Sequence, residues 1–262
     1  MLCNLWVASA LCAVALSAPA IPYSSGAAER PTEMKVLSDY FNMLGSKVQA
    51  GKQMAEAPVC DLSKAILPTA SPTALPNASK GLVLKHVAIG RGTQNYSCST
   101  ANSTAPPAAV GALATLYNAS CVASTYPDLL NILPSVALQF NLTSVSQASL
   151  TPSNLAISGH HLFTNTTTPF FTLNTDAMQL GVAPCAKNNS VSAPTGAVKG
   201  QYDQGFGAVP WLKLTARSGA TGNLEEVYRV NTAGGNPPAT CAGMPATFEV
   251  QYAAEYWFYQ KA

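Results

Sequence analysis

Charged side chains are scarce in this sequence of 262 residues. Asp, Glu, Lys and Arg together make up 10% of it, against about 25% in ordinary soluble domains. The net charge is +2 and no cluster of Lys or Arg occurs, which argues against nucleic acid or an anionic membrane as a partner. A surface so poor in charge is prone to association, so we expect another source of hydration.

The sequence motifs of several enzyme classes are also missing. There is no G-x-S-x-G turn and no H-E-x-x-H helix. The run Gly90-Arg91-Gly92 begins like a dinucleotide-binding fingerprint, but Asn95 stands where the third glycine belongs and no helical pattern follows. We interpret this run as a tight turn or bulge, and we assign no catalytic residue and no cofactor.

Closely spaced metal-binding cysteines are absent too. Two of the seven cysteines lie within residues 1–20, and no two of the other five form a C-x-x-C pair, so we predict no zinc site and no other metal. In an oxidising compartment five cysteines give two disulfides and one spare thiol. Spacing alone does not choose among the pairings of these five: Cys60, Cys98, Cys121, Cys185 and Cys241.

The N-terminus has the pattern of a secretory signal. Residues 1–20 hold no charged side chain, and an apolar run is followed by Ala18-Pro19-Ala20. We predict a signal peptide over 1–20, cut after Ala20, and a flexible tail over 21–31. The alternative is a membrane anchor, but the apolar run is too short to span a bilayer and no later run is long enough.

Seven Asn-x-Ser/Thr sequons fit the same compartment, because such sites are used only in the secretory lumen. They are Asn77, Asn95, Asn102, Asn118, Asn141, Asn165 and Asn188. Glycans would supply the hydration that charge does not. Asn95 is the doubtful site, so we predict that five or six are occupied. All precede residue 200, and we expect any partner-binding face after it.

The periodicity of apolar residues predicts a helix and then strands. A helical spacing within 32–57 predicts one amphipathic helix, packed on the domain or free to bind a partner: Leu37, Phe41, Leu44 and Val48. Residues 58–262 carry short β-rich runs broken by Gly, Pro, Asn and Ser, and residues 248–258 alternate between apolar and mixed positions. We predict a mainly β fold, a single β-sandwich or barrel-like domain with one N-terminal helix.

Few residues offer binding chemistry. His160 and His161 point to opposite faces of a strand, and His161 with Asp176 would form a His–carboxylate couple. Arg229 and Trp211 are more often structural than ligand-binding in such settings. A binding pocket would gather members of one candidate set: His161, Asp176, Arg91, Trp211 and Arg229.

Several segments resemble DUF3455, a secreted fungal and bacterial family of unknown function. The resemblance rests on these runs: Gly90–Cys98, Gly159–Phe163, Val209–Leu212, Arg229–Cys241 and Val250–Phe258. It implies a β-rich secreted domain without established activity, and a Cys98–Cys241 bridge with one more among Cys60, Cys121 and Cys185. Members are often labelled malate dehydrogenase, which the failed fingerprint and the predicted secretion argue against.

Three hypotheses of function follow. The first is a non-catalytic extracellular glycoprotein of the cell wall or host interface, which binds a small molecule, a glycan or a protein. The second is a secreted enzyme of unrecognised type that uses His161 with Asp176 as an acid–base couple. The third, the dehydrogenase label, requires binding of a nicotinamide cofactor.

Overall fold

The computed structural model describes residues 32–51, 60–99, 101–142, 149–150 and 152–262. The predicted signal peptide, 1–20, and the predicted tail, 21–31, lie outside the described residues. None of the helices in the described ranges is long and apolar enough to cross a membrane.

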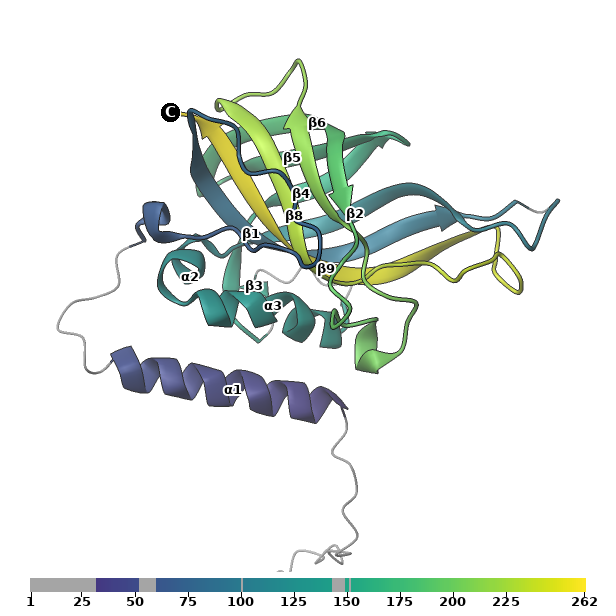
Figure 1. Cartoon of the computed structure of the whole chain (residues 1–262), viewed down its shortest axis with the longest axis horizontal. Coiled ribbons are helices and arrows are strands. Elements are labelled where there is room, and N and C mark those ends of the chain that lie inside the picture. The colour runs from purple at the N-terminus through teal and green to yellow at the C-terminus, as the bar shows by residue number, and fades with distance from the viewer. Residues whose placement is uncertain (1–31, 52–59, 100, 143–148, 151) are drawn as a thin grey trace, which may run out of the picture. The chain divides into compact units, whose positions relative to one another are not determined.

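Eight antiparallel strands close into a barrel (Figure 1), in the order β1-β2-β4-β5-β6-β7-β8-β9 and back to β1. Their bounds are β1 Leu82–Ser97, β2 Ala108–Asn118, β4 Leu155–Asn165, β5 Thr168–Thr175, β6 Met178–Val191, β7 Trp211–Ala216, β8 Leu224–Gly234 and β9 Thr247–Lys261. The β2–β4 pairing closes the circle, and β3, Ser149–Leu150, adds a short pair to β4. This confirms the mainly β prediction in its barrel form.

The helices lie outside the barrel. α1, Thr32–Gly51, confirms the predicted N-terminal helix, while residues 52–57 of the predicted range lie outside the described part. The sequence pattern missed α2, Ser120–Thr125, and α3, Pro127–Gln139. Short 3₁₀ turns, η1 at Leu62–Lys64 and η2 at Gln201–Asp203, complete the elements.

The apolar core has two layers, one on each side of the barrel wall. β9 shows why: Tyr252 and Tyr256 point into the lumen, whereas Ala253 and Trp257 point outward and belong to the layer under α3. Both sets are fully buried. The predicted alternation of β9 is therefore present, but its mixed face is covered by α3 rather than by solvent.

The Gly90-Arg91-Gly92 run lies in the middle of β1, and the predicted turn or bulge is wrong. β1 continues through it, paired with β2 and β9 without a break in register. The glycines are needed for close approach, since a Cβ on Gly90 would overlap the ring of Tyr256 and one on Gly92 would overlap the β2 backbone. Here glycine marks tight packing inside a barrel, one of its uses in strands.

Two disulfides tie loops to this barrel, which confirms that the chain carries disulfide bonds. Cys98 is joined to Cys241, and Cys60 to Cys121. Cys185 is a buried thiol on the lumen side of β6. The first bridge links the end of β1 to the loop before β9, and the second links the segment before β1 to α2.

Candidate functional site

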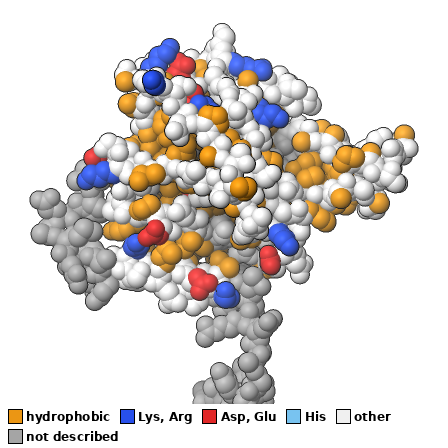
Figure 2. Space-filling view, in the orientation of Figure 1, with side chains coloured by type: hydrophobic (Ala, Val, Ile, Leu, Met, Phe, Trp, Pro, Cys, Tyr) orange, Lys and Arg blue, Asp and Glu red, His pale blue; other side chains and the backbone are white. Residues whose placement is uncertain are grey.

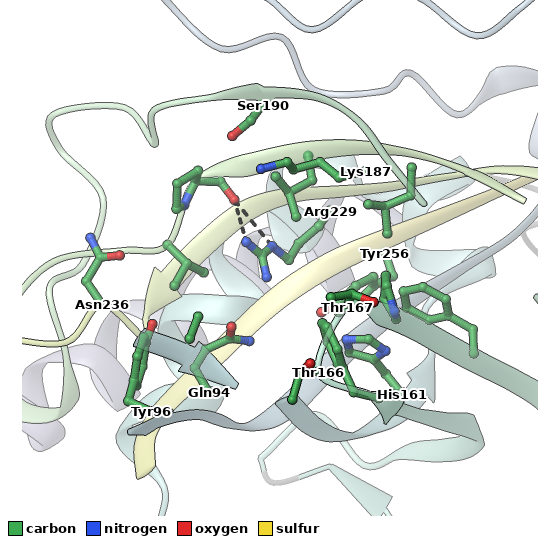
Figure 3. Close-up of a pocket in the computed structure, with 18 residues that line it drawn as sticks. Gln94, Tyr96, His161, Thr166, Thr167, Lys187, Ser190, Arg229, Asn236 and Tyr256 are labelled. Atoms are coloured by element: carbon green, nitrogen blue, oxygen red, sulfur yellow. Dashed lines mark hydrogen bonds between the residues drawn. The ribbon is translucent and has the colours of Figure 1, made fainter. Parts of the chain in front are cut away.

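The barrel lumen opens at one end into a cavity of about 360 Å³ (Figure 3). All eight barrel strands, or the loops that join them, contribute to its wall. Deeper in the lumen, buried apolar side chains fill the space, among them Leu116, Leu173 and Phe258. The site is therefore a dead-end pocket, and its volume is at the lower end of the range for small-molecule sites, roughly 300–1,000 Å³.

Arg229 carries a positive charge into this pocket from β8. It is 8% exposed, and its Nε and Nη2 both donate to the Pro210 carbonyl oxygen, at 3.3 and 2.9 Å. These two bonds hold the guanidinium against the wall, as Figure 3 shows. Among the described residues no carboxylate lies within ion-pair distance of it.

His161 enters the pocket from β4, the strand opposite β8 in the closed order of eight. Its ring stacks on Phe171, with centroids 4.3 Å apart and an interplanar angle of 10°, and Nδ1 donates to the Phe170 carbonyl oxygen at 3.0 Å. Burial first, and then the charge of Arg229, lowers the pKa of His161 to about 4. The imidazole is therefore neutral in ordinary buffers, with Nε2 as an acceptor.

Aromatic and polar groups complete the lining. The hydroxyl oxygens of Tyr252 and Tyr256 lie 2.9 Å apart beneath Arg229, and burial raises the pKa of Tyr256 while the Arg229 charge opposes it. Gln94 is buried, and none of the described residues accepts a hydrogen bond from its Nε2. Lys187 stands in the lining as a second cation. No acidic residue of the described ranges lines the pocket, so its electrostatic character is positive.

The structure does not bring His161 and Asp176 together. Phe171 pairs with His161, and Asp176 is exposed in the turn five residues further along the chain, beyond the far end of β5. At about 3.3 Å per residue this is roughly 17 Å away. His160 is exposed on the outer face, as the strand alternation predicts.

Arg91 and Trp211 lie on the outside of the barrel wall. Arg91 is 2% exposed, and it donates to carbonyl oxygens at the end of α3, from Nε to Ala137 at 3.1 Å and from Nη2 to Phe140 at 3.0 Å. It also donates to the Gly92 and Tyr252 carbonyls. Trp211 is buried in the layer that contains α3. Only His161 and Arg229 of the predicted set meet in the pocket.

Two features of this site were missed in the sequence. Gln94 and Tyr256 lie in runs that carry the family resemblance, but neither was a candidate binding residue, and their placement follows from the inward register of β1 and β9, which the closed barrel sets. The alternation of residues 248–258 was the available signal for Tyr256. In the described ranges, no group of His, Cys, Asp and Glu gathers in a way that would hold a metal ion.

These features define a class: a closed, eight-stranded antiparallel barrel with a positively charged pocket at one mouth. The family described as "Protein of unknown function (DUF3455)" matches residues 78–260, and the chain belongs to this family. No curated protein and no solved structure matches the chain. The comparisons thus give the family, and the pocket must supply the argument about function.

Proposed function

We propose that this protein is a secreted, non-catalytic binding protein that holds a small organic anion in the mouth of its barrel. The observation that carries the proposal is Arg229, a buried guanidinium in a pocket lined by no acidic residue. A buried charge without a counter-charge is costly. An anionic ligand would supply the missing partner, and guanidinium groups suit carboxylates and phosphates because they donate in a planar fork.

The fold supports a binding role. Eight-stranded barrels leave an interior that side chains fill or that holds one small ligand, and here the deep part is filled while the mouth is hollow. The alternative, an enzyme that uses His161 with Asp176, has less support because Asp176 lies beyond the end of β5, five residues along the chain from the Phe171 that pairs with His161. The disulfides and the exposed sequons support secretion, because disulfides form and sequons are glycosylated in the secretory pathway.

Calorimetric titration of the full-length secreted protein tests this proposal. Three aromatic anions serve as probes, benzoate, phenyl phosphate and benzenesulfonate, with neutral benzamide as their control. We expect at least one anion to bind and benzamide not to bind. Arg229→Gln should weaken the binding by roughly 30-fold or more, since losing one partner of a buried charge pair costs about 2–5 kcal/mol.

Arg217 provides a matched control. It is exposed in the loop between β7 and β8, outside the pocket lining, so Arg217→Gln removes the same charge without touching the site. Its affinity should equal that of the unaltered protein. If none of the three anions binds in a manner that depends on Arg229, the proposal is wrong.

A further inference from the structure

The pocket has a second recognition element, which faces Arg229 from the opposite wall. His161 donates through Nδ1 to the Phe170 carbonyl, so the tautomer is fixed and Nε2 is left as an acceptor. No hydrogen bond to Nε2 is made by any residue in the part of the chain that the structure describes. His161 is 3% exposed, and it lines the cavity. Nε2 is therefore available to accept a hydrogen bond from a donor on a ligand in the cavity.

The wall between these two residues is rich in rings. Phe163, Phe171, Tyr96 and Tyr256 line the cavity together with the His161 imidazole, and His161 already stacks on Phe171. Rings favour other rings in offset or edge-to-face contact. A cavity of about 150 Å³ is enough for a benzene molecule, so about 360 Å³ accommodates a substituted ring.

Gln94 adds a further unmet polar group. Its side chain lines the cavity from β1, separated from His161 on β4 only by β2, and its buried Nε2 donor has no partner among the residues that the structure describes. A hydroxyl both donates and accepts, so it is the smallest substituent that suits the His161 acceptor and the Gln94 donor alike. An amine would satisfy only the first, and it would bring a positive charge toward Arg229 and Lys187.

We propose that the ligand is a hydroxylated aromatic acid, whose anionic group binds Arg229, whose ring lies among the aromatic side chains, and whose hydroxyl donates to His161 Nε2. This inference rests on the proposed function, because it names the chemical class of the anion that the barrel mouth holds. Figure 3 shows the two anchors, with Arg229 and His161 on opposite sides of the open space. A ligand that bridges them must carry its acid and its hydroxyl on different edges of the ring.

The test compares pairs of acids that differ only at the hydroxyl. The full-length protein is titrated with benzoate, the three isomeric hydroxybenzoates and their methyl ethers. We expect at least one hydroxybenzoate to bind about tenfold more tightly than its methyl ether and than benzoate, the effect of one well-placed hydrogen bond. In His161→Phe, which keeps a ring against Phe171, this preference should fall to about twofold or less while benzoate affinity changes little.

His160→Phe is the matched control, because it makes the same substitution one position away on the outer face. It should keep the full preference of the unaltered protein. Benzoate binding to each variant shows whether the pocket is intact. If His161→Phe does not fold, the inference is judged only by whether the unaltered protein prefers a hydroxybenzoate to its methyl ether.

Failure of this inference differs from failure of the proposed function. Acids that bind through Arg229, with no isomer preferred over its methyl ether, would overturn the hydroxyl inference and leave anion binding in place. A preference that survives in His161→Phe would also overturn it. Absence of binding by every acid would remove both.

Discussion

Two arginines of the barrel wall show how the side of the wall decides the role of a residue. Arg91 points outward and meets the last turn of α3, where helix carbonyls lack backbone partners and a positive charge is favourable. Arg229 points inward and meets a cavity. Both were equal candidates in the sequence, because residue type alone does not report which face a strand position takes.

Arg91 should therefore matter for stability and not for binding. Arg91→Gln leaves buried carbonyls of α3 without donors, and we expect a loss of about 2–4 kcal/mol in the free energy of unfolding. Urea denaturation measures this, with Arg217→Gln as the exposed control. Affinity for the aromatic anions should stay unchanged in the folded variant. A loss of affinity with no loss of stability would contradict the capping role.

Glu255 gives a pH dependence of known sign. It is fully buried on the outward face of β9, where it accepts from Asn231 Nδ2 at 2.7 Å and Trp257 Nε1 at 2.9 Å. Burial raises its pKa from 4.5 to about 7, against the effect of these two bonds. Between these values the folded chain holds a proton that the unfolded chain releases. The stability so gained is complete below pH 4.5 and is lost as pH rises through 7.

Glu255→Gln should remove this dependence. One pKa unit corresponds to about 1.4 kcal/mol. From pH 4.5 to 8, the free energy of unfolding of the unaltered protein should therefore fall by about 3 kcal/mol relative to that of the variant. Urea denaturation across that range measures it. The pKa values of the buried His86 and His161 are lowered to about 4; their opposing pH dependence is common to both proteins and cancels. If the free energies of unfolding of the two proteins change in parallel with pH, Glu255 is not the titrating group.

At the scale of elements, β1 and β9 form the wall on which the pocket depends. β1 pairs with β2 on one side and with β9 on the other, and Gly90 lets the Tyr256 ring approach the strand closely. That ring forms part of the pocket lining. Gly90 thus shapes the site without contacting a ligand.

Gly90→Ala should destabilise the barrel and disturb the pocket. The new methyl overlaps the buried Tyr256 ring, and overpacking of this kind costs about 1–3 kcal/mol. Thermal denaturation measures the loss, and anion titration should show weaker binding because Tyr256 must move. Gly196→Ala, at a position with open space around it, is the control and should be neutral. Unchanged stability in Gly90→Ala would show that the ring has room to move.

A second element-scale feature is the segment before β1, which lies along the outer face of β7 and β8. Lys213 Nζ binds Glu226 Oε1 at 3.0 Å, and both Ser79 groups, N–H and hydroxyl, donate to the same carboxylate. Lys213 also donates to the Asn77 carbonyl. The pair is therefore occupied in holding this segment, and it offers no free charge to a partner.

For the whole molecule, the scarcity of charge is visible on the surface. Figure 2 shows a few scattered Lys, Arg, Asp and Glu side chains on the face it presents, with apolar side chains between them. Five sequon asparagines are exposed, Asn77, Asn102, Asn141, Asn165 and Asn188. Asn95 and Asn118 are half-buried in β1 and β2, where each side-chain oxygen accepts a local hydrogen bond.

We therefore expect five occupied glycosylation sites when the chain is expressed in a eukaryotic secretory host, the lower of the two numbers that the sequence suggested. Intact mass before and after enzymatic deglycosylation, with peptide mapping, measures the occupancy. Asn95→Gln and Asn118→Gln should leave the mass of attached glycan unchanged, whereas Asn102→Gln should lower it by one glycan. Glycan on Asn95 or Asn118 would contradict the expectation.

The class of fold and the family follow from the amino-acid sequence alone. Periodicity predicted α1 and six of the eight barrel strands because apolar spacing reports local geometry, and the alternation of residues 248–258 predicted the apolar face of β9. It did not predict β2 or β6. Pro134 inside α3 and the short length of α2 hid both helices. Gly90 and Gly92 suggested a turn because the contacts that require them come from other strands: Tyr256 of β9 approaches Gly90, and the β2 backbone approaches Gly92.

The position and the composition of the site depend on how the strands assemble in three dimensions. Closure of the barrel places β4 opposite β8, and this alone brings His161 to the pocket that holds Arg229 while Arg91, Trp211 and Asp176 fall elsewhere. Sequence fixes which residues alternate along a strand, but inward and outward are defined only when the first and last strands meet. The charge of the pocket depends on that closure, because closure determines which charged side chains point into the lumen and which point outward.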